Sequence, residues 1–293
     1  MIALLNAMPG SIAQGLIWGI MAVGVYLTYK VLDYADLSVD GSFCTGGAVA
    51  VMLMLSGHNV FVALVFAFIA GMIAGYVTGV LHTFLKIPAI LSGILTQLAL
   101  YSINLAIMGK SNQAISVDKY NLLVSIRFIN LTIIVTLIIV AVVIGLLYLF
   151  FGTEIGSAIR ATGDNQNMAR AQGINTGRCI RIGLVLSNGL VAFSGGLYAQ
   201  YQGNADVNAG RGAIVIGLAA VIIGEVIFGV KHNFAFKLAT SVVGAIIYYI
   251  VIAIVLQLGL PSSFLKLLSA CIVALFLSIP TLKSYKDQIS LRK

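Results

Sequence analysis

The sequence predicts an all-α polytopic membrane protein with about nine transmembrane segments, in a range of about eight to ten. Of its 293 residues, 60% are hydrophobic and only 9% are charged, whereas a soluble domain carries roughly 25% charged residues. The hydrophobic residues fall into long runs, most of them near the ~20 residues that a helix needs to cross a ~30 Å hydrocarbon core. Composition and run length together favour a bundle of membrane helices over a soluble fold.

The apolar runs cover nearly the whole chain. They lie near residues 11–32, 41–56, 59–84, 88–109, 129–151, 179–202, 213–229, 236–258 and 264–282. Residues 1–10 carry no charged side chain, so the chain is predicted to begin with a membrane helix and not with a signal peptide. One membrane domain is expected over residues 1–293. The cysteines Cys44, Cys179 and Cys271 have no metal-ligand spacing and are predicted to be free, buried thiols.

The second and seventh runs are shorter than a full span and rich in glycine. Short, glycine-interrupted segments at matching places in two halves are a sign of broken helices beside a transport path. Two short, similar sequences precede them, YADL at 34–37 and NADV at 204–207. If successive runs alternate in direction, the two copies face opposite sides of the membrane, as two inverted-repeat halves require. The match is short, so chance similarity stays open as the alternative.

An acidic cluster precedes the second run. The segment DYADLSVDGSF holds Asp33, Asp36 and Asp40 within eight residues. A charge at membrane depth is costly unless it is paired or hydrated, which leaves two interpretations. In the first, the segment is a solvated inner loop in which Asp40 or Ser38 caps the second helix. In the second, the break rises into the bundle, and Asp36 and Asp40 border a translocation path.

A few other polar side chains fall inside apolar runs. Gln97 and Asn104 are seven residues apart and share a helix face with Tyr101, so they predict a stripe that lines such a path. Hydrogen bonding between helices is the other common use of these residues. Glu225 is the only Glu inside an apolar run. It is predicted to pair with Lys231 or to reach the inner surface, and a gate or coupling contact is the alternative.

The longest polar stretch, residues 152–181, carries four arginines, a Glu and an Asp between two apolar runs. Thr153 is expected to cap a short helix that ends at Gly163, and Asp164 is expected to cap a second one that ends at Gly173. Two helices of about ten residues each are not stable alone. They therefore need a surface to lie on, although an ordinary polar loop is the simpler interpretation.

Within this stretch the pattern GSAIRATGDNQNMARAQGI, residues 156–174, resembles the cytoplasmic coupling segment of ABC importer permeases. The likeness is closest to the family that serves branched-chain amino acids, ribose and related sugars. The resemblance implies that residues 152–178 dock into a cleft of a separate ATP-hydrolysing subunit. The residues assigned to this contact are Glu154, Gly156, Ala158, Arg160, Ala161, Gly163, Asn165, Ala169, Arg170 and Gly173.

The resemblance implies the transmembrane permease subunit of an ATP-driven importer for a small solute, with no cofactor. Its expected partners are a cytoplasmic ATP-binding subunit, an extracytoplasmic solute-binding protein, membrane lipid and a second copy of the chain, because two coupling segments are needed. The acidic segment also looks like the subgroup associated with uptake of tryptophan or other amino acids, so an amino acid is the expected solute and an aromatic one is a candidate within that class. Nucleosides, sugars and other small metabolites stay open as alternatives, because the binding protein usually sets specificity in such systems. The translocation path is expected to include Asp36, Asp40, Gln97, Tyr101, Asn104 and Glu225.

No phosphate-binding loop of the form GxxxxGK[ST] occurs in the sequence, so ATP hydrolysis is assigned to another subunit and the chain is not expected to be an enzyme. An ion-coupled secondary carrier stays open as an alternative, and an integral membrane enzyme as a weaker one. The net charge of +8 indicates orientation in a bilayer and not nucleic-acid binding. With residues 152–181 inside, 12 of the 17 Lys and Arg fall inside and 5 outside. This predicts an outer N-terminus and an inner C-terminus in a prokaryotic cell membrane.

Overall fold

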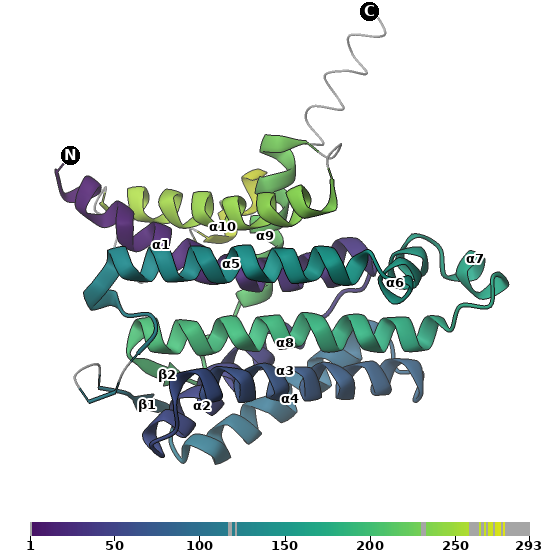
Figure 1. The fold of residues 1–293 in the computed structure, drawn as a ribbon, viewed down its shortest axis with the longest axis horizontal. Coiled ribbons are helices and arrows are strands. Elements are labelled where there is room, and N and C mark those ends of the chain that lie inside the picture. The colour runs from purple at the N-terminus through teal and green to yellow at the C-terminus, as the bar shows by residue number, and fades with distance from the viewer. Residues whose placement is uncertain are drawn as a thin grey trace, which may run out of the picture.

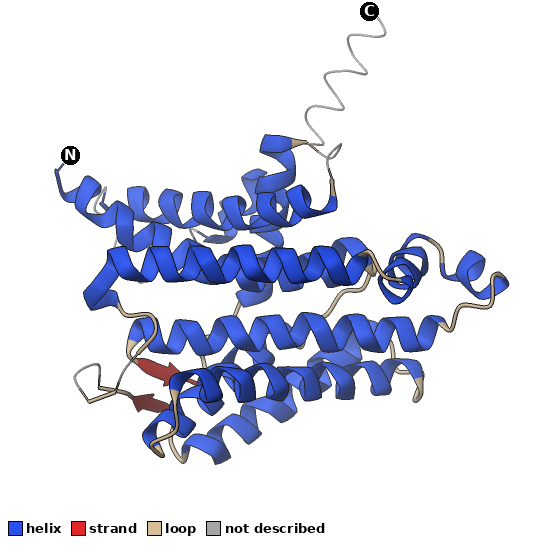
Figure 2. Ribbon diagram, viewed as in Figure 1, coloured by secondary structure: helices blue, strands red, loops and turns tan. Residues whose placement is uncertain are grey.

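The computed structural model describes residues 2–116, 119–120, 122–229 and 233–257, together with residues 264, 267, 269–271, 273–276 and 278. These residues are almost entirely helical, as predicted (Figure 1, Figure 2). A two-stranded antiparallel sheet, in which Asn112 lies opposite Asp206, was not predicted. The elements are α1 (Ile2–Tyr26), the π-helical turn η1 (Leu27–Val31), α2 (Val39–Leu55), α3 (Val60–Thr83), α4 (Ala89–Met108), β1 (Asn112–Ala114), the 3-10 turn η2 (Ile126–Phe128), α5 (Ile129–Phe151), α6 (Glu154–Asp164), α7 (Gln166–Ala171), α8 (Thr176–Gln202), β2 (Asn204–Asp206), α9 (Ala213–Phe228) and α10 (Phe234–Gln257).

Six segments among the described residues are long and apolar enough to cross a membrane. They are Ala7–Val31, Val60–Thr83, Ala89–Met108, Ile126–Phe151, Thr176–Gln202 and Phe234–Gln257. Each follows a predicted apolar run closely. The second and seventh runs form the shorter helices α2 and α9, of 17 and 16 residues. The ninth run, 264–282, is described only in part, at the ten positions given above. The rest of the described chain contains six long apolar helices and these two short ones.

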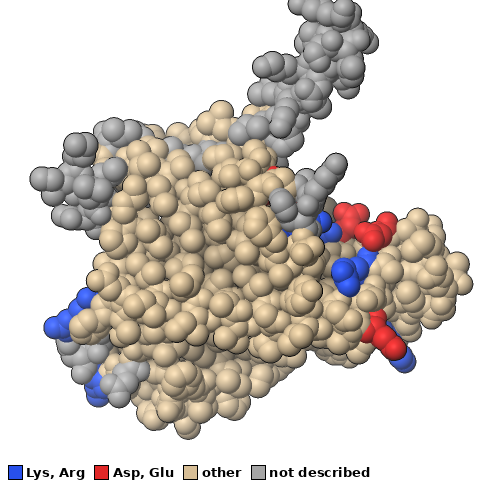
Figure 3. Space-filling view, turned by 45° about the horizontal axis from the view of Figure 1, so that its top comes forward, with Lys and Arg blue, Asp and Glu red and all other residues tan. Residues whose placement is uncertain are grey.

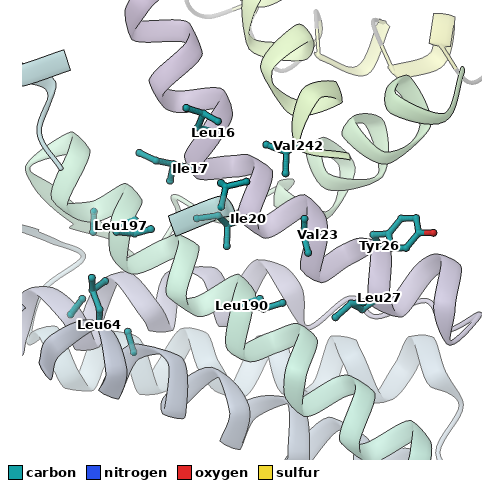
Figure 4. Packing of buried hydrophobic residues seen from close by; sticks show 14 of the residues in the cluster. Leu16, Ile17, Ile20, Val23, Tyr26, Leu27, Leu64, Leu190, Leu197 and Val242 are labelled. Atoms are coloured by element: carbon teal, nitrogen blue, oxygen red, sulfur yellow. The ribbon is translucent and has the colours of Figure 1, made fainter. Parts of the chain in front are cut away.

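Helix α8 lies at the centre of the bundle, where it packs against α1, α2 and α3. Glycines allow the backbones to approach closely: a side chain at Gly46 of α2 would collide with the carbonyl of Ala192 in α8, and one at Gly195 would collide with that of Phe43. Such small-residue contacts are the usual way in which membrane helices pack. The largest apolar cluster fills the same region (Figure 4), where α1, α3, α8 and α10 all contribute side chains.

Helices α9 and α10 pack against each other and against α1 on the other side of the bundle. Gly224 of α9 faces the carbonyl of Thr240, and Gly244 of α10 faces that of Ala220. A second apolar cluster lies here, around Trp18 of α1. The first helix is therefore enclosed by α8 on one side and by α9 and α10 on the other.

The two ends of the bundle differ in content. The N-terminus and the β1–β2 sheet lie at one end, and α6 and α7 lie at the opposite end (Figure 1). On the face drawn in Figure 3, charged side chains gather near these two ends, with a broad band of other residues between them. This distribution is typical of a protein whose middle lies in hydrocarbon.

The cysteine prediction is correct in part. Cys44 and Cys179 are free and buried, but Cys271 is free and exposed. Cys271 lies in a run that the sequence marks as apolar, and apolar residues of membrane helices often face lipid instead of other protein atoms. Burial was therefore wrongly inferred from hydrophobicity alone.

Candidate functional site

The two short helices begin at the same place. Asp40, in the first turn of α2, accepts hydrogen bonds from the backbone N–H groups of Gly212 and Ile214, each at 2.9 Å. Its carboxylate thus caps the N-terminus of α9, where the donors are otherwise unpaired and the helix dipole favours a negative charge. Gly212 has φ +87°, a left-handed conformation that glycine adopts without steric cost. We call this meeting point, defined by Asp40, Gly212 and Ile214, the junction.

The junction lies between the two ends of the bundle. Helix α2 runs from it toward the β1–β2 end, where Met54 near its last turn lines a pocket with Lys119 and Tyr120. Helix α9 runs the other way, because Glu225 in its last turn pairs with Lys30 of η1, and η1 contacts α6. Two short helices therefore start in the interior of the bundle and diverge toward opposite ends.

A cavity of about 310 Å³ lies beside the junction. It brings together four residues of the predicted path, contributed by α2 and α4. Five other residues line it, and two of them, Cys44 and Arg211, carry reactive or charged groups that the sequence did not assign to the path. Arg211 was counted only as an outer positive charge, and no local pattern distinguishes it from the others. The lining consists of Asp40, Gly41, Cys44, Gln97, Leu98, Tyr101, Asn104, Val207 and Arg211.

The cavity holds one acidic and one basic side chain. The carboxylate of Asp40 is held by α9, and the guanidinium of Arg211 lies 5.9 Å from the centre of the Tyr101 ring, within reach of a cation–π interaction. The thiol of Cys44 donates a hydrogen bond to the backbone carbonyl of Val207. A site with fixed opposite charges and an aromatic wall suits a small zwitterionic ligand.

Asn104 contributes an unsatisfied polar atom to this lining. Its amide nitrogen donates a long hydrogen bond of 3.4 Å to the carbonyl of Gly41. Its side-chain oxygen is buried and has no hydrogen-bond partner among the described residues. An orphan acceptor is costly in a buried site, and a donor placed in the cavity would satisfy it. Asn104 therefore links α4 to α2 and also offers an acceptor to a ligand.

Asp36 does not line this cavity. It is buried, and it accepts hydrogen bonds from the N–H and hydroxyl of Ser38 and from the amide of Asn188 in α8, at 2.9, 2.5 and 2.7 Å. The oxygen of Asn188 in turn accepts a hydrogen bond from Ser42 at 2.6 Å. The interpretation as a solvated loop is therefore wrong for Asp36, and Asp33 is the exposed member of the cluster. Neither predicted cap holds, because Ser38 makes no capping hydrogen bond to α2 and Asp40 caps α9 instead.

Glu225 also lies away from the cavity. Its carboxylate is 2.8 Å from the ammonium group of Lys30, so it connects the end of α9 to the end of the first helix. The predicted partner Lys231 lies outside the described residues. Pairing to a cation at this end was expected, but the described partner comes from the distant N-terminal segment.

The second candidate region is formed by α6 and α7 with their caps, residues 153–173, which we call the α6–α7 segment. The hydroxyl of Thr153 accepts a hydrogen bond from the N–H of Gly156, as predicted. The second cap is Asn165 and not Asp164: the side chain of Asn165 accepts from the N–H groups of Asn167 and Met168, each at 3.0 Å. Asp164 is instead the last residue of α6, so the first helix extends one residue beyond Gly163.

Most of the small residues predicted to face a partner face the rest of this chain. Gly156 and Ala169 are buried, and Ala158 and Ala161 are half-buried. A side chain at Gly163 would collide with the carbonyl of Val31. These glycines and alanines therefore pack the segment against its own bundle, and their predicted contact with a partner stays a prediction.

The two arginines of the segment have partners within the chain. Arg160 donates to the carbonyl of Phe151 at 2.5 Å and lies over the ring of Phe234. Arg170 donates to the hydroxyl of Thr176 at 3.0 Å and to Gln166. Glu154, Asn165, Arg170 and Gly173 are exposed.

Two large apolar residues on the segment point outward instead. Ile155 and Met168 are 52% and 44% exposed on an otherwise polar surface. Neither residue was predicted from the sequence, where the small residues and the charges of the segment were taken as the contact. An exposed apolar side chain within a stretch that must sit in water was the available signal.

Comparisons with known proteins agree on one family. The family model described as "Branched-chain amino acid transport system / permease component" matches residues 8–277. A tyrosine transport system permease protein of Clostridioides difficile (strain R20291) is 41% identical over 96% of this chain and 92% of its own length. An uncharacterized protein of Rickettsia prowazekii (strain Madrid E) is 33% identical over 95% of this chain and 99% of its own length.

Two further matches are more distant. An autoinducer 2 import system permease protein of Yersinia pseudotuberculosis (strain YPIII) is 30% identical over 71% of this chain and 58% of its own length. A solved structure described as PsaBC from Streptococcus pneumoniae in complex with Fab superimposes with a TM-score of 0.51 over 94% of this chain and 91% of that chain. It is 14% identical, so it supports the fold alone.

Proposed function

We propose a specific role for this chain on the premise that it belongs to the permease component family of branched-chain amino acid transport systems. The chain is a multi-pass membrane permease of an ABC importer, and members of its family are transporters and not enzymes. Its solute is an amino acid, and an aromatic one is the first candidate. The observation that carries this proposal is the cavity at the junction, which contains both Asp40 and Arg211.

The chemistry of the cavity supports an amino acid. Its volume of about 310 Å³ is at the lower end of the ~300–1,000 Å³ of ligand pockets, which suits a small solute. A free amino acid carries a carboxylate for Arg211 and an ammonium group for Asp40, and Tyr101 supplies an aromatic surface. The name of the Clostridioides difficile relative adds independent support for tyrosine.

The direction of the two short helices supports two inverted halves. Helices α2 and α9 follow the matching YADL and NADV segments, start at one point and diverge. Broken helices that meet at the midplane around a solute are typical of transport proteins with inverted repeats. About nine transmembrane segments remain our estimate for the whole chain. The N-terminus faces outside and the α6–α7 segment faces the cytoplasm, since this arrangement follows the positive-inside rule.

The α6–α7 segment is the contact with a separate ATP-hydrolysing subunit. Ile155 and Met168 are exposed there, and apolar anchors at the centre of a polar rim dominate the binding energy of interfaces. Glu154, Asn165 and Arg170 surround them as exposed polar groups. A solute-binding protein delivers the amino acid at the other end.

Two copies of the chain enclose the path. Leu98 and Tyr101, on the wall of the cavity, are 64% and 40% exposed in the single chain. A cavity with charged groups is expensive to face toward lipid. A second copy placed against α4 covers it, and it also provides the second coupling segment that a pair of ATPase subunits needs.

The test is uptake of labelled tyrosine by the complete transporter, the permease with its ATPase and binding protein. Arg211→Gln is expected to reduce uptake at least tenfold, because the carboxylate loses its charged partner. Lys110→Gln removes an exposed charge that does not line the cavity and is expected to leave uptake unchanged. If Arg211→Gln transports tyrosine at the wild-type rate, the cavity is not the solute site.

A further inference from the structure

A second cavity lies at the end of the bundle that carries the α6–α7 segment. Its volume is about 550 Å³, and it is enclosed by the connection between α3 and α4, by α7 and by the first turns of α8. Lys86, Arg170 and Arg181 line it together with His82, and no Asp or Glu does. Three permanent cations thus surround a hollow without a carboxylate in its described lining.

These cations are not neutralised within the described chain. The ion pair found there joins Lys30 and Glu225, so none of the three has a described carboxylate within 4.0 Å. Arg181 uses its Nε to donate to the carbonyl of Gly177 at 3.2 Å, which leaves its terminal N–H groups available. The cavity also borders the N-terminus of the 27-residue helix α8, the positive end of the helix dipole. All of these features favour an anion.

Exposed apolar side chains lie beside this cavity. Phe84, which lines the cavity, is 77% exposed, and the neighbouring Leu85 is 56% exposed. Only 39% of the apolar window of α3 is buried. An exposed apolar helix that ends beside a cluster of cations matches a molecule with an anionic head and hydrocarbon chains.

We propose that this cavity binds the headgroup of an acidic phospholipid, whose phosphate lies between Lys86 and Arg181 and whose acyl chains lie along α3. A soluble acidic partner is the weaker alternative, since it would not cover Phe84 and Leu85. The site is distinct from the cavity at the junction, because the two linings share no residue.

The test uses the full-length chain purified in detergent and native mass spectrometry with phosphatidylglycerol or phosphatidylcholine of the same acyl chains. The wild type is expected to prefer phosphatidylglycerol. Each removed charge is expected to weaken that binding about fivefold, so Lys86→Gln with Arg181→Gln weakens it about 25-fold and leaves phosphatidylcholine binding unchanged. Arg178→Gln is the matched control, because Arg178 is an exposed cation in the first turn of α8 that does not line the cavity.

The single variants guard against loss of folding in the double variant, and thermal melting in detergent checks each of them. Equal preference for phosphatidylglycerol in the wild type and both single variants would overturn the proposal. Displacement of the lipid by millimolar inorganic phosphate would also overturn it, in favour of a free-phosphate site. So would loss of the ATPase subunit from the Lys86→Gln and Arg181→Gln complexes with lipid preference retained, because the cavity would then be a protein contact.

Discussion

The junction and the α6–α7 segment are the two polar regions of this chain, and they use their polar groups differently. At the junction, both carboxylate oxygens of Asp40 bind backbone N–H groups of another helix, and Asp36 nearby is saturated by Ser38 and Asn188. In the α6–α7 segment, Thr153 and Asn165 bind N–H groups only two or three residues away. Asp36 is buried among helices, whereas Thr153 and Asn165 are exposed. Polar groups buried away from solvent need partners from other elements, whereas exposed ones do not.

This difference separates structural from functional residues. Asp40 at the junction binds backbone N–H groups of α9 and also lines the cavity, where Arg211, Gln97 and Tyr101 are the other polar side chains of the proposed solute site. The glycines of the α6–α7 segment hold it on the bundle, which leaves Ile155 and Met168 for a partner. In both regions, some residues that the sequence assigned to a path or a partner contact hold the protein's own backbone instead, as Asp36 and Gly163 do.

The largest effect is expected at the close contact between α2 and α8, which holds the helix that carries Asp40. Gly46→Ala places a methyl group against the carbonyl of Ala192, and because backbone cannot yield as a flexible side chain can, it is expected to lower the free energy of unfolding by about 3 kcal/mol. Gly145→Ala is the matched control, since nothing lies within 4 Å of that position in α5. It is expected to be neutral or to stabilise by up to about 1 kcal/mol. Thermal melting in detergent measures both, and equal melting temperatures would contradict the close α2–α8 contact.

The next effect concerns the buried carboxylate beside the junction. Asp36→Ala leaves the donors of Ser38 and Asn188 without their acceptor, which is expected to cost about 2–3 kcal/mol of unfolding free energy. Asp33→Ala removes an exposed acid from the same segment and is expected to change stability by less than about 0.5 kcal/mol. Denaturation of the two variants in parallel measures the loss of unfolding free energy in each. Equal losses would mean that Asp36 is hydrated and that its hydrogen bonds do not stabilise the fold.

A smaller effect is expected at the α6–α7 segment, on binding and not on folding. Ile155→Ser and Met168→Ser each remove an exposed apolar contact and are expected to weaken retention of the ATPase subunit by about 2 kcal/mol, with unchanged melting of the permease. Asn167→Ala, on the same exposed surface, serves as the control. Co-purification at graded ATPase concentrations gives the affinity. Wild-type retention by both serine variants would move the contact elsewhere.

Much of the fold follows from the sequence because membrane helices are encoded by run length alone. The short helices α2 and α9 were predicted for the same reason. Their meeting at Asp40 was not predicted, because Asp40 and Gly212 are 172 residues apart and nothing local connects them. Arg211 and the Lys30–Glu225 pair were missed for the same reason.

The site residues show where local patterns stop being informative. Gln97, Tyr101 and Asn104 share a helix face, so their common position in the cavity follows from helix geometry. Whether Gly156 or Ile155 faces a partner depends instead on which side of α6 rests on the bundle. That choice is made by tertiary contacts such as Gly163 against Val31, which spacing does not reveal.

The smallest effect distinguishes two adjacent capping candidates. Asp164 and Asn165 are both good N-cap residues, and only the backbone decides between them: Asn165 has φ −160° and ψ 104°, the extended conformation of a cap, while Asp164 is still helical. Asn165→Ala is therefore expected to destabilise α7 locally by about 1 kcal/mol and to speed hydrogen exchange at the amides of Asn167 and Met168. Asp164→Ala removes a side chain of the same size one residue earlier and is expected to leave that exchange unchanged.

Because α7 has only six residues, it cannot hold itself together by its own helical hydrogen bonds. The Asn165 cap and the burial of Ala169 against the bundle must therefore stabilise it. Loss of the cap would free the turn that carries Met168. Hydrogen exchange that accelerates equally in both variants would mean that the two residues share the cap. Unchanged hydrogen exchange in both variants would mean instead that contact with the bundle alone keeps the α6–α7 segment ordered.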